Sequence, residues 1–206
     1  MELPKSLPRH YAVHSTINLS RNRWLAIGLN LGAFILFFIF VCCFTYLAIL
    51  LHPNLQITFI QMGQLNLPSL IMIFAFLLII QAILHELTHS FFFWLFTEHR
   101  PRFSRKWLQA YAYATAPEDY YLPRNQYILA LSAPFLLITL GGLAWLPLSS
   151  IDWVPILVFI MAANAAGAIG DLFMVGWILR QPSTAIVRDA GVAVIVYQFE
   201  SSSPTG

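Results

Sequence analysis

Charged residues are scarce in this chain, since Asp, Glu, Lys and Arg make up only 10% of its 206 residues while hydrophobic residues make up 59%. A soluble domain carries about 25% charged residues. The shortage excludes an ordinary soluble domain, and a formal net charge of +2 is too small to favour a nucleic-acid partner. Most of the chain must therefore contact the lipid bilayer or other apolar helices, which predicts an integral membrane protein.

Cysteine is also rare, because the chain has only Cys42 and Cys43, which are adjacent within an apolar run. They are expected to behave as small buried hydrophobes and support no disulfide or redox function. Residues 1–23 lack the short apolar segment and the small-residue cleavage site of a secretory signal. With four basic residues and two prolines, these residues predict a basic, loosely ordered cytoplasmic arm.

Four apolar runs are each long enough, at about 1.5 Å of helix rise per residue, to cross a hydrocarbon core of about 30 Å. We predict transmembrane helices over residues 24–51, 67–96, 126–146 and 153–179, within a single membrane domain of residues 24–180. The predicted fold class is an all-α membrane protein with four transmembrane helices and a small cytoplasmic β element.

Lys and Arg are absent from the loops at residues 52–66 and 147–152. Nine of the eleven lie in the N-terminal arm or in the loop at residues 98–125. The other two are Arg180, just before the tail at residues 181–206, and Arg188 within it. The positive-inside rule therefore predicts that both termini and the long loop are cytoplasmic. We expect a multi-pass protein with N-in/C-in topology in a plasma membrane of the bacterial type.

Two segments outside the spans are predicted to be strands. Trp107–Thr115 alternates large and small side chains, and Gly191–Phe199 is rich in Val and Ile. The first follows the second span and could take up an unwound membrane substrate as an added strand. It could equally pair with the second predicted strand, and the sequence leaves both interpretations open.

The second predicted span contains the sequence His85-Glu86-Leu87-Thr88-His89. A helix turns about 100° per residue, so the two histidines project from one face and can hold one metal ion. Glu86 emerges beside His85 and can take a proton from a water that the ion activates. This is the HExxH pattern of zinc peptidases. Ionisable groups at bilayer depth cost roughly 2.5 kcal/mol or more each, which a purely structural helix would have no reason to carry.

Asp171 is the only other ionisable group within a predicted span. The second and fourth spans both run toward the cytoplasm, and His85 and Asp171 each lie 18 residues after the start of their span. This is about 27 Å along each helix, so the two side chains are predicted at the same depth. A lone buried carboxylate needs a partner, and we predict that Asp171 holds Zn²⁺ together with His85 and His89. Three protein ligands and one open position are typical of a catalytic zinc site.

Three further residues are candidates for substrate binding or for supporting the ligands. Gln81 lies one turn before His85 on the same helix face, where it could support that ligand or bond a neighbouring helix. Asn164 lies two turns before Asp171 and could contact substrate or join helices by a hydrogen bond. Gly170 immediately precedes Asp171.

The HExxH pattern within a transmembrane helix, followed two spans later by NAAGAIGD at Asn164–Asp171, resembles the DUF3267 family of zincin peptidases. More distantly it is similar to the site-2 protease class of intramembrane metalloproteases. The resemblance covers about residues 67–180. It implies that zinc is held by the two histidines and the aspartate of these motifs, with the motif glutamate as general base.

These observations predict an intramembrane zinc metalloendopeptidase that hydrolyses peptide bonds of a membrane protein or peptide near the cytoplasmic face. The alternative is a catalytically inactive metal-binding membrane scaffold or chaperone. A transporter is less favoured, because four spans without an internal repeat are unusual for that class. Retention of Glu86 favours the enzyme, because a scaffold has no use for a base at that position.

Overall fold

The computed structural model of the chain describes these residues: 7–8, 10–18, 21–55, 65–99, 102–105, 112–115, 120–191 and 193–200. The chain divides into two compact units. The first unit comprises Met1–Gly28, Glu86–Ala133 and Asp171–Gly206, and the second comprises Leu29–His85 and Pro134–Gly170.

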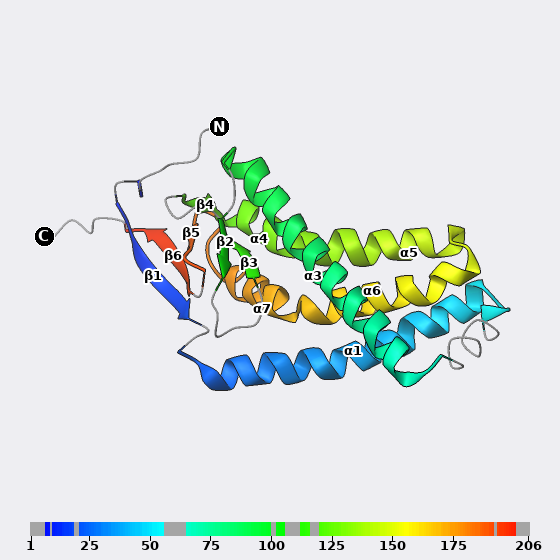
Figure 1. Cartoon of the computed structure of the whole chain (residues 1–206). Coiled ribbons are helices and arrows are strands. Elements are labelled where there is room, and N and C mark those ends of the chain that lie inside the picture. Colours follow the sequence, from blue (N-terminus) through cyan, green and yellow to red (C-terminus); the bar gives the residue numbers. More distant parts are fainter. Residues whose placement is uncertain are drawn as a thin grey trace, which may run out of the picture. The chain divides into compact units, whose positions relative to one another are not determined.

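The protein is mostly helical, as predicted, with a small antiparallel sheet (Figure 1). The described helices are α1 (Arg23–Leu51), α3 (Leu67–Thr97), α4 (Arg124–Pro134), the π-helix η1 (Phe135–Leu140), α5 (Gly141–Trp145), the 3₁₀ turns η2 (Leu146–Leu148) and η3 (Ile151–Trp153), α6 (Val154–Gly167) and α7 (Ile169–Ile178).

Three helical stretches are long and apolar enough to cross a membrane: Arg23–Leu51, Leu67–Thr97 and Arg124–Leu148. A fourth span is possible if the bent pair Ile151–Gly167 and Ile169–Ile178 crosses as one. These three to four apolar helices are consistent with the predicted membrane protein. The side of the membrane on which each end lies stays a prediction.

The predicted helix over residues 153–179 is not straight. It is broken at Ala168, where α6 ends and α7 begins at an angle of 41°. Gly167 and Gly170 flank the break, and glycine is destabilising in a helix interior by about 1 kcal/mol. Small residues also allow close helix packing, so this stretch of the sequence is compatible with both a packing surface and a bend.

The starts of the two longest helices follow from their capping residues. Asn22 Oδ1 accepts a hydrogen bond from Leu25 N–H at 3.1 Å, ahead of α1. Asn66 Oδ1 accepts one from Ser69 N–H at 3.0 Å, ahead of α3. Asparagine is among the best residues at this position, because its side-chain oxygen satisfies a backbone donor that the first turn leaves without a partner.

Within the second unit, α5 and α6 approach closely. A Cβ atom on Gly142 would lie 2.5 Å from Met161 Cγ of α6, so a larger residue there would require the Met161 side chain to shift. Ala162 and Ala165 of α6 are buried in one apolar core with Phe44 of α1. Small residues let helices approach closely, which is the usual mode of packing in a membrane. Cys42 and Cys43 of α1 are exposed, which corrects the expectation that they are buried.

The first unit contains a four-stranded antiparallel sheet in the order β1-β6-β5-β4 (Figure 1). Its strands are β1 (Tyr11–Asn18), β6 (Ala193–Phe199), β5 (Ile186–Asp189) and β4 (Leu122–Pro123). The predicted strand over residues 191–199 is therefore confirmed as β6. Its partner β1 corrects the prediction that residues 1–23 form a loosely ordered arm. The prolines and arginines of that segment flank a run, Tyr11–Asn18, that is itself free of Pro, Gly, Lys and Arg and can extend as a strand.

A separate two-stranded sheet pairs β2 (Arg102–Arg105) with β3 (Ala112–Thr115) in antiparallel register. Residues 107–111 of the predicted strand Trp107–Thr115 lie outside the described residues. The described part, β3, does not pair with β6, because β6 lies between β1 and β5. The prediction that this segment pairs with the strand at residues 191–199 is therefore wrong for its described part. The backbone of β3 pairs instead with the nearby strand β2.

The core of the first unit joins the sheet to the helices. Side chains of β5 and β6, such as Val187 and Val196, pack in one buried cluster with Tyr127 of α4 and Ile178 of α7. Arg124 caps the C-terminal end of α7. Its guanidinium donates hydrogen bonds to the backbone carbonyls of Ile178 at 3.1 Å and of Leu179 at 2.9 Å. A cation at a helix C-terminus satisfies the last carbonyls and complements the helix dipole.

Candidate metal centre

The first unit places His89 of α3 beside Asp171, which lies in the first turn of α7. His89 Nε2 lies 3.4 Å from Asp171 Oδ2. The histidine side chain is buried, with 6% of its surface exposed, while the carboxylate retains 23%. The pair thus combines a sheltered imidazole with a carboxylate that solvent or a ligand can reach.

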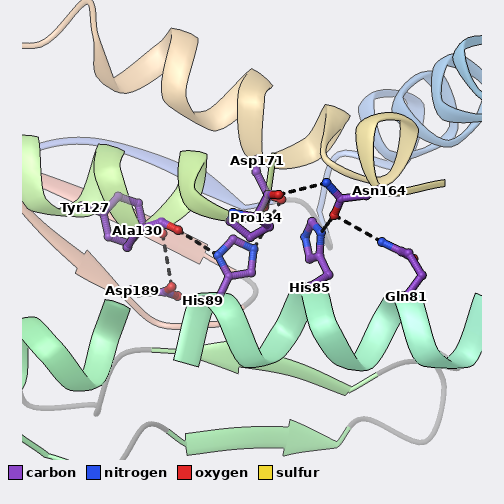
Figure 2. Close-up of polar contacts among 9 residues, drawn as sticks. All are labelled: Gln81, His85, His89, Tyr127, Ala130, Pro134, Asn164, Asp171 and Asp189. Atoms are coloured by element: carbon purple, nitrogen blue, oxygen red, sulfur yellow. Dashed lines mark hydrogen bonds and ion pairs between the residues drawn. The ribbon is translucent and has the colours of Figure 1, made fainter. Parts of the chain in front are cut away.

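The imidazole of His89 is oriented by a backbone group. Its Nδ1 lies 3.0 Å from the carbonyl oxygen of Ala130 on α4, and Tyr127 lies one turn earlier on the same helix (Figure 2). A carbonyl only accepts hydrogen bonds, so Nδ1 carries the hydrogen and the ring's lone pair is on Nε2, toward Asp171. Ala130 can accept this bond because its usual helical donor would be the N–H of residue 134, and Pro134 has none.

The second unit holds His85 through a side chain. His85 Nδ1 lies 3.0 Å from Asn164 Oδ1 of α6, and Gln81 Nε2 donates to the same oxygen at 3.4 Å. Figure 2 shows Gln81, His85 and His89 projecting from one side of α3, as the helical spacing predicted. Because α3 runs without a break through His85 and Glu86, the spacing of the two histidines follows from the helix itself.

His85, His89 and Asp171 can each offer one ligand atom, and these three atoms all lie within 4.8 Å of one another. Zinc binds imidazole nitrogen at about 2.0–2.1 Å and carboxylate oxygen at about 2.0–2.2 Å in tetrahedral geometry. Two such ligands are separated by about 3.3 Å, close to the 3.4 Å between His89 Nε2 and Asp171 Oδ2. Two imidazoles and one carboxylate, at this spacing, fit a zinc ion.

Glu86 lies next to His85 on α3 and is half-buried. It does not belong to the described group of three possible ligands, in keeping with a role other than metal binding. Gly170 precedes Asp171 at the start of α7, and a Cβ atom added there would meet nothing within 4 Å. Its lack of a side chain is therefore not required by packing at this position.

A second buried polar group in the first unit was not anticipated from the sequence. Asp189, at the end of β5, accepts hydrogen bonds from Tyr127 O–H at 3.2 Å and from Gly191 N–H at 2.7 Å. Burial raises the pKa of the Asp189 carboxyl to about 6, although both hydrogen bonds act to lower it. Gly191 adopts a φ of 78°, which glycine reaches without strain, and this turn brings its N–H to the carboxylate.

Of the predicted residues, His85, His89 and Asp171 form the group of possible ligands, Asn164 bonds to His85, and Gln81 bonds to Asn164 and not to His85. Ala130, Tyr127 and Asp189 were not predicted from the sequence. No side-chain signal could have identified Ala130, because it acts through its backbone carbonyl, but the proline four residues later is a usable clue. Asp189 follows a short Ile-Val-Arg run in the tail, which could have been interpreted as a half-buried strand.

A comparison with protein-family models gives one match, over residues 78–186, to the family DUF3267, described as "Putative zincin peptidase". The matched segment is more than half of the chain and contains the HExxH motif and Asp171. No curated protein and no solved structure matches the chain. The likeness to site-2 proteases therefore stays a prediction.

Proposed function

The chain belongs to the DUF3267 family of zincin peptidases, and we propose that it is a zinc-dependent metalloendopeptidase that cleaves peptide bonds of membrane-embedded substrates. The observation that carries the proposal is the group formed by His85, His89 and Asp171. Its ligand atoms lie within 4.8 Å of one another in a chain with three or four helices able to span a membrane. Two imidazoles with one carboxylate are a donor set used by catalytic zinc, which keeps a further position open.

Four residues have distinct roles in the proposed peptide hydrolysis. When bound, zinc supplies a Lewis acid that polarises the scissile carbonyl and activates water. His85, His89 and Asp171 hold the ion and fix its position. Glu86, one residue after the first ligand, takes the proton from the attacking water as the C–O bond forms. The same carboxyl then gives that proton to the leaving amine nitrogen as the C–N bond breaks.

A membrane-embedded substrate is proposed because the HExxH motif lies within α3, one of the helices able to span a membrane. A helical substrate buries its amide groups in its own hydrogen bonds, so it must unwind before it is cleaved. The motif lies in the last half of α3, which ends at Thr97, just before the arginine-rich loop. By the positive-inside rule that end is cytoplasmic, and cleavage is proposed near that face.

Reporter fusions test the proposed orientation. Fusions at Gly63 and at Ser149 should report the extracytoplasmic compartment, and a fusion at Gly206 should report the cytoplasm, because the eleven basic residues lie on one side of the predicted spans. A cytoplasmic signal from Gly63 would reverse the topology and move cleavage to the opposite face.

The experiment that tests the peptidase itself is Glu86→Gln. The substitution keeps size and hydrogen bonding but removes the base, and positioned acid–base groups contribute about 10²–10⁴-fold in rate. Cleavage of a candidate membrane substrate should therefore fall by that factor while zinc stoichiometry stays at the parent's value. The matched control is Glu98→Gln, the same chemical change at an exposed position just after α3, which should leave both quantities unchanged.

The same variant, assayed for cellular function as well as for cleavage, separates the enzyme from the alternative, an inactive metal-binding scaffold. A scaffold has no chemical task for Glu86, so its cellular function would survive Glu86→Gln. Cellular function that persists in Glu86→Gln, with no cleavage by the parent protein, would reject the peptidase in favour of the scaffold.

A further inference from the structure

Asn164 of α6 is fully buried, with 0% of its surface exposed, in the second unit. A side-chain amide can make four hydrogen bonds, two as donor and two as acceptor. Asn164 makes all four. Its Nδ2 donates to the Pro134 carbonyl at 2.9 Å and to Thr139 Oγ1 at 2.9 Å, and its Oδ1 lies 3.0 Å from His85 Nδ1 and 3.4 Å from Gln81 Nε2.

These bonds fix which way the amide of Asn164 faces. The Pro134 carbonyl can only accept, so the atom directed at it must be the NH₂ group. The oxygen of the same amide then faces His85, and it can only accept as well. Nδ1 of His85 must therefore carry the ring hydrogen, which leaves the acceptor lone pair on Nε2.

The π-helix η1 explains why two acceptors meet at one amide. Pro134 immediately precedes η1, and Thr139 lies five residues after it. In an α-helix, residues five apart point about 140° away from each other. The i→i+5 bonding of a π-helix instead places them on one face, so that the Pro134 carbonyl and the Thr139 hydroxyl both reach Asn164. Single π-turns within α-helices are frequent at functional sites.

We propose that Asn164 is a positioning residue that holds His85 as the Nδ1–H tautomer and so presents Nε2 as a metal ligand. This inference rests on the proposed function, because it concerns a ligand of the proposed zinc site. Both amide hydrogens of Asn164 are engaged within the chain, so the residue acts through His85 and not on the substrate. The two acceptors, the Pro134 carbonyl and the Thr139 hydroxyl, prevent the amide from rotating to offer its NH₂ group to the imidazole.

The direct test measures the histidine tautomers in the metal-free protein. Full-length chain is produced with ¹⁵N-labelled histidine, and the nitrogen signals of His85 are identified by their loss in His85→Gln. The parent should show the Nδ1–H tautomer for His85, and Asn164→Leu should show a mixture of both tautomers. His52 provides an internal reference, because its Nε2 lies 2.9 Å from the Leu146 carbonyl and so carries the hydrogen. Its signals should be the same in every variant.

Zinc affinity, measured by competition with a chelator, supplies the second readout. Loss of an outer partner of a metal-binding histidine costs about 10–100-fold in affinity, and we expect a loss in this range for Asn164→Leu. Asn164→Asp keeps an oxygen that accepts from His85, and in its neutral form its O–H can donate to the Pro134 carbonyl in place of the lost NH₂ group, so it should keep the Nδ1–H tautomer and restore most of the affinity. Equal loss in the Leu and Asp variants would show that Asn164 only packs the helices and would overturn the proposal.

A second pair of variants applies if Asn164→Leu does not fold. Thr139→Val removes one of the two acceptors that orient the amide, and Thr139→Ser retains it. We expect zinc affinity to fall several-fold in Thr139→Val and to recover in Thr139→Ser. Unchanged affinity and an unchanged His85 tautomer in Thr139→Val would overturn the role of η1.

The tautomer measurement separates this inference from the proposed function. A single Nδ1–H tautomer in the parent that is lost in Asn164→Leu supports the positioning role even if the protein cleaves nothing. An unchanged tautomer in Asn164→Leu overturns it, even if Glu86→Gln establishes the peptidase.

Discussion

The two units hold their histidines through the same ring atom but by different kinds of partner. In the first unit, His89 donates from Nδ1 to the backbone carbonyl of Ala130. In the second unit, His85 donates from Nδ1 to the side chain of Asn164. A backbone acceptor survives any side-chain substitution at its own position, whereas a side-chain acceptor is lost with a single substitution. One histidine is therefore held by the backbone and the other by the side chain of a single residue.

Pro134 contributes to both arrangements through the chemistry of its backbone. Its missing N–H leaves the Ala130 carbonyl available to His89, and its own carbonyl accepts from Asn164. Proline within a transmembrane helix is tolerated where neighbouring groups bond to the backbone atoms that it releases. In this protein, the carbonyl that Pro134 releases is that of Ala130, and His89 itself bonds to it.

The largest expected effect is common to both units. Zinc content should drop sharply in His85→Ala, in His89→Ala and in Asp171→Ala, because a site with two remaining ligands cannot hold the ion tightly. Metal analysis of the purified variants checks this. Zinc retained at the parent's level in Asp171→Ala would mean that the carboxylate beside His89 is not the third ligand.

The next effect concerns the pH dependence of stability, in which the two units differ. The first unit contains the buried carboxyl of Asp189, whereas the second unit contains the buried neutral amide of Asn164. The pKa of Asp189 is about 6 in the folded protein against 3.8 ordinarily, so the folded state binds the proton more tightly. The contribution of Asp189 protonation to the free energy of unfolding is fully present below pH 3.8 and is lost as pH rises through about 6. The difference of about two pKa units corresponds to about 3 kcal/mol in the free energy of unfolding.

Asp189→Asn should remove this contribution to the pH dependence. Denaturant unfolding of the detergent-solubilised protein between pH 4 and 7 measures it, with Asp152→Asn at an exposed position as the matched control. The control should follow the parent's profile. An Asp189→Asn profile that also follows the parent's would mean that this carboxyl is ionised throughout and that burial does not govern its protonation.

Features of the fold and of the candidate site that depend on side-chain patterns could be predicted from the sequence, whereas those that depend on the backbone could not. The HExxH spacing, the lone carboxylate of Asp171 and the long apolar runs are side-chain patterns, and they predicted the residues of the candidate site and the long helices. The bend at Ala168 was missed because the neighbouring glycines favour both close packing and helix breaks. The role of Thr139 depends on the π-helix, whose formation no residue pattern specifies.

A smaller effect is expected where the two arrangements share a residue. Pro134→Ala restores an N–H that competes with His89 for the Ala130 carbonyl, so zinc affinity should fall by less than about tenfold. Chelator competition measures the change. Affinity equal to the parent's would show that the carbonyl accommodates both donors, and Pro134 would then have no part in orienting His89.

The smallest effect sharpens the contrast between backbone and side-chain partners. Ala130→Gly removes the side chain but keeps the carbonyl, so zinc affinity should stay within about twofold of the parent while stability falls by about 1 kcal/mol, the cost of glycine in a helix. A loss of zinc affinity as large as that of Asn164→Leu would abolish the distinction between the two units.

X-ray absorption at the zinc edge of the loaded, full-length protein tests the central claim most directly. The account predicts a shell of nitrogen and oxygen at about 2.0–2.2 Å with the outer scattering of two imidazoles, reduced to one imidazole in His89→Ala variants loaded with excess zinc. A sulfur shell at about 2.3 Å, which would require Cys42 or Cys43, or a parent spectrum with fewer than two imidazoles, would contradict a site made by His85, His89 and Asp171.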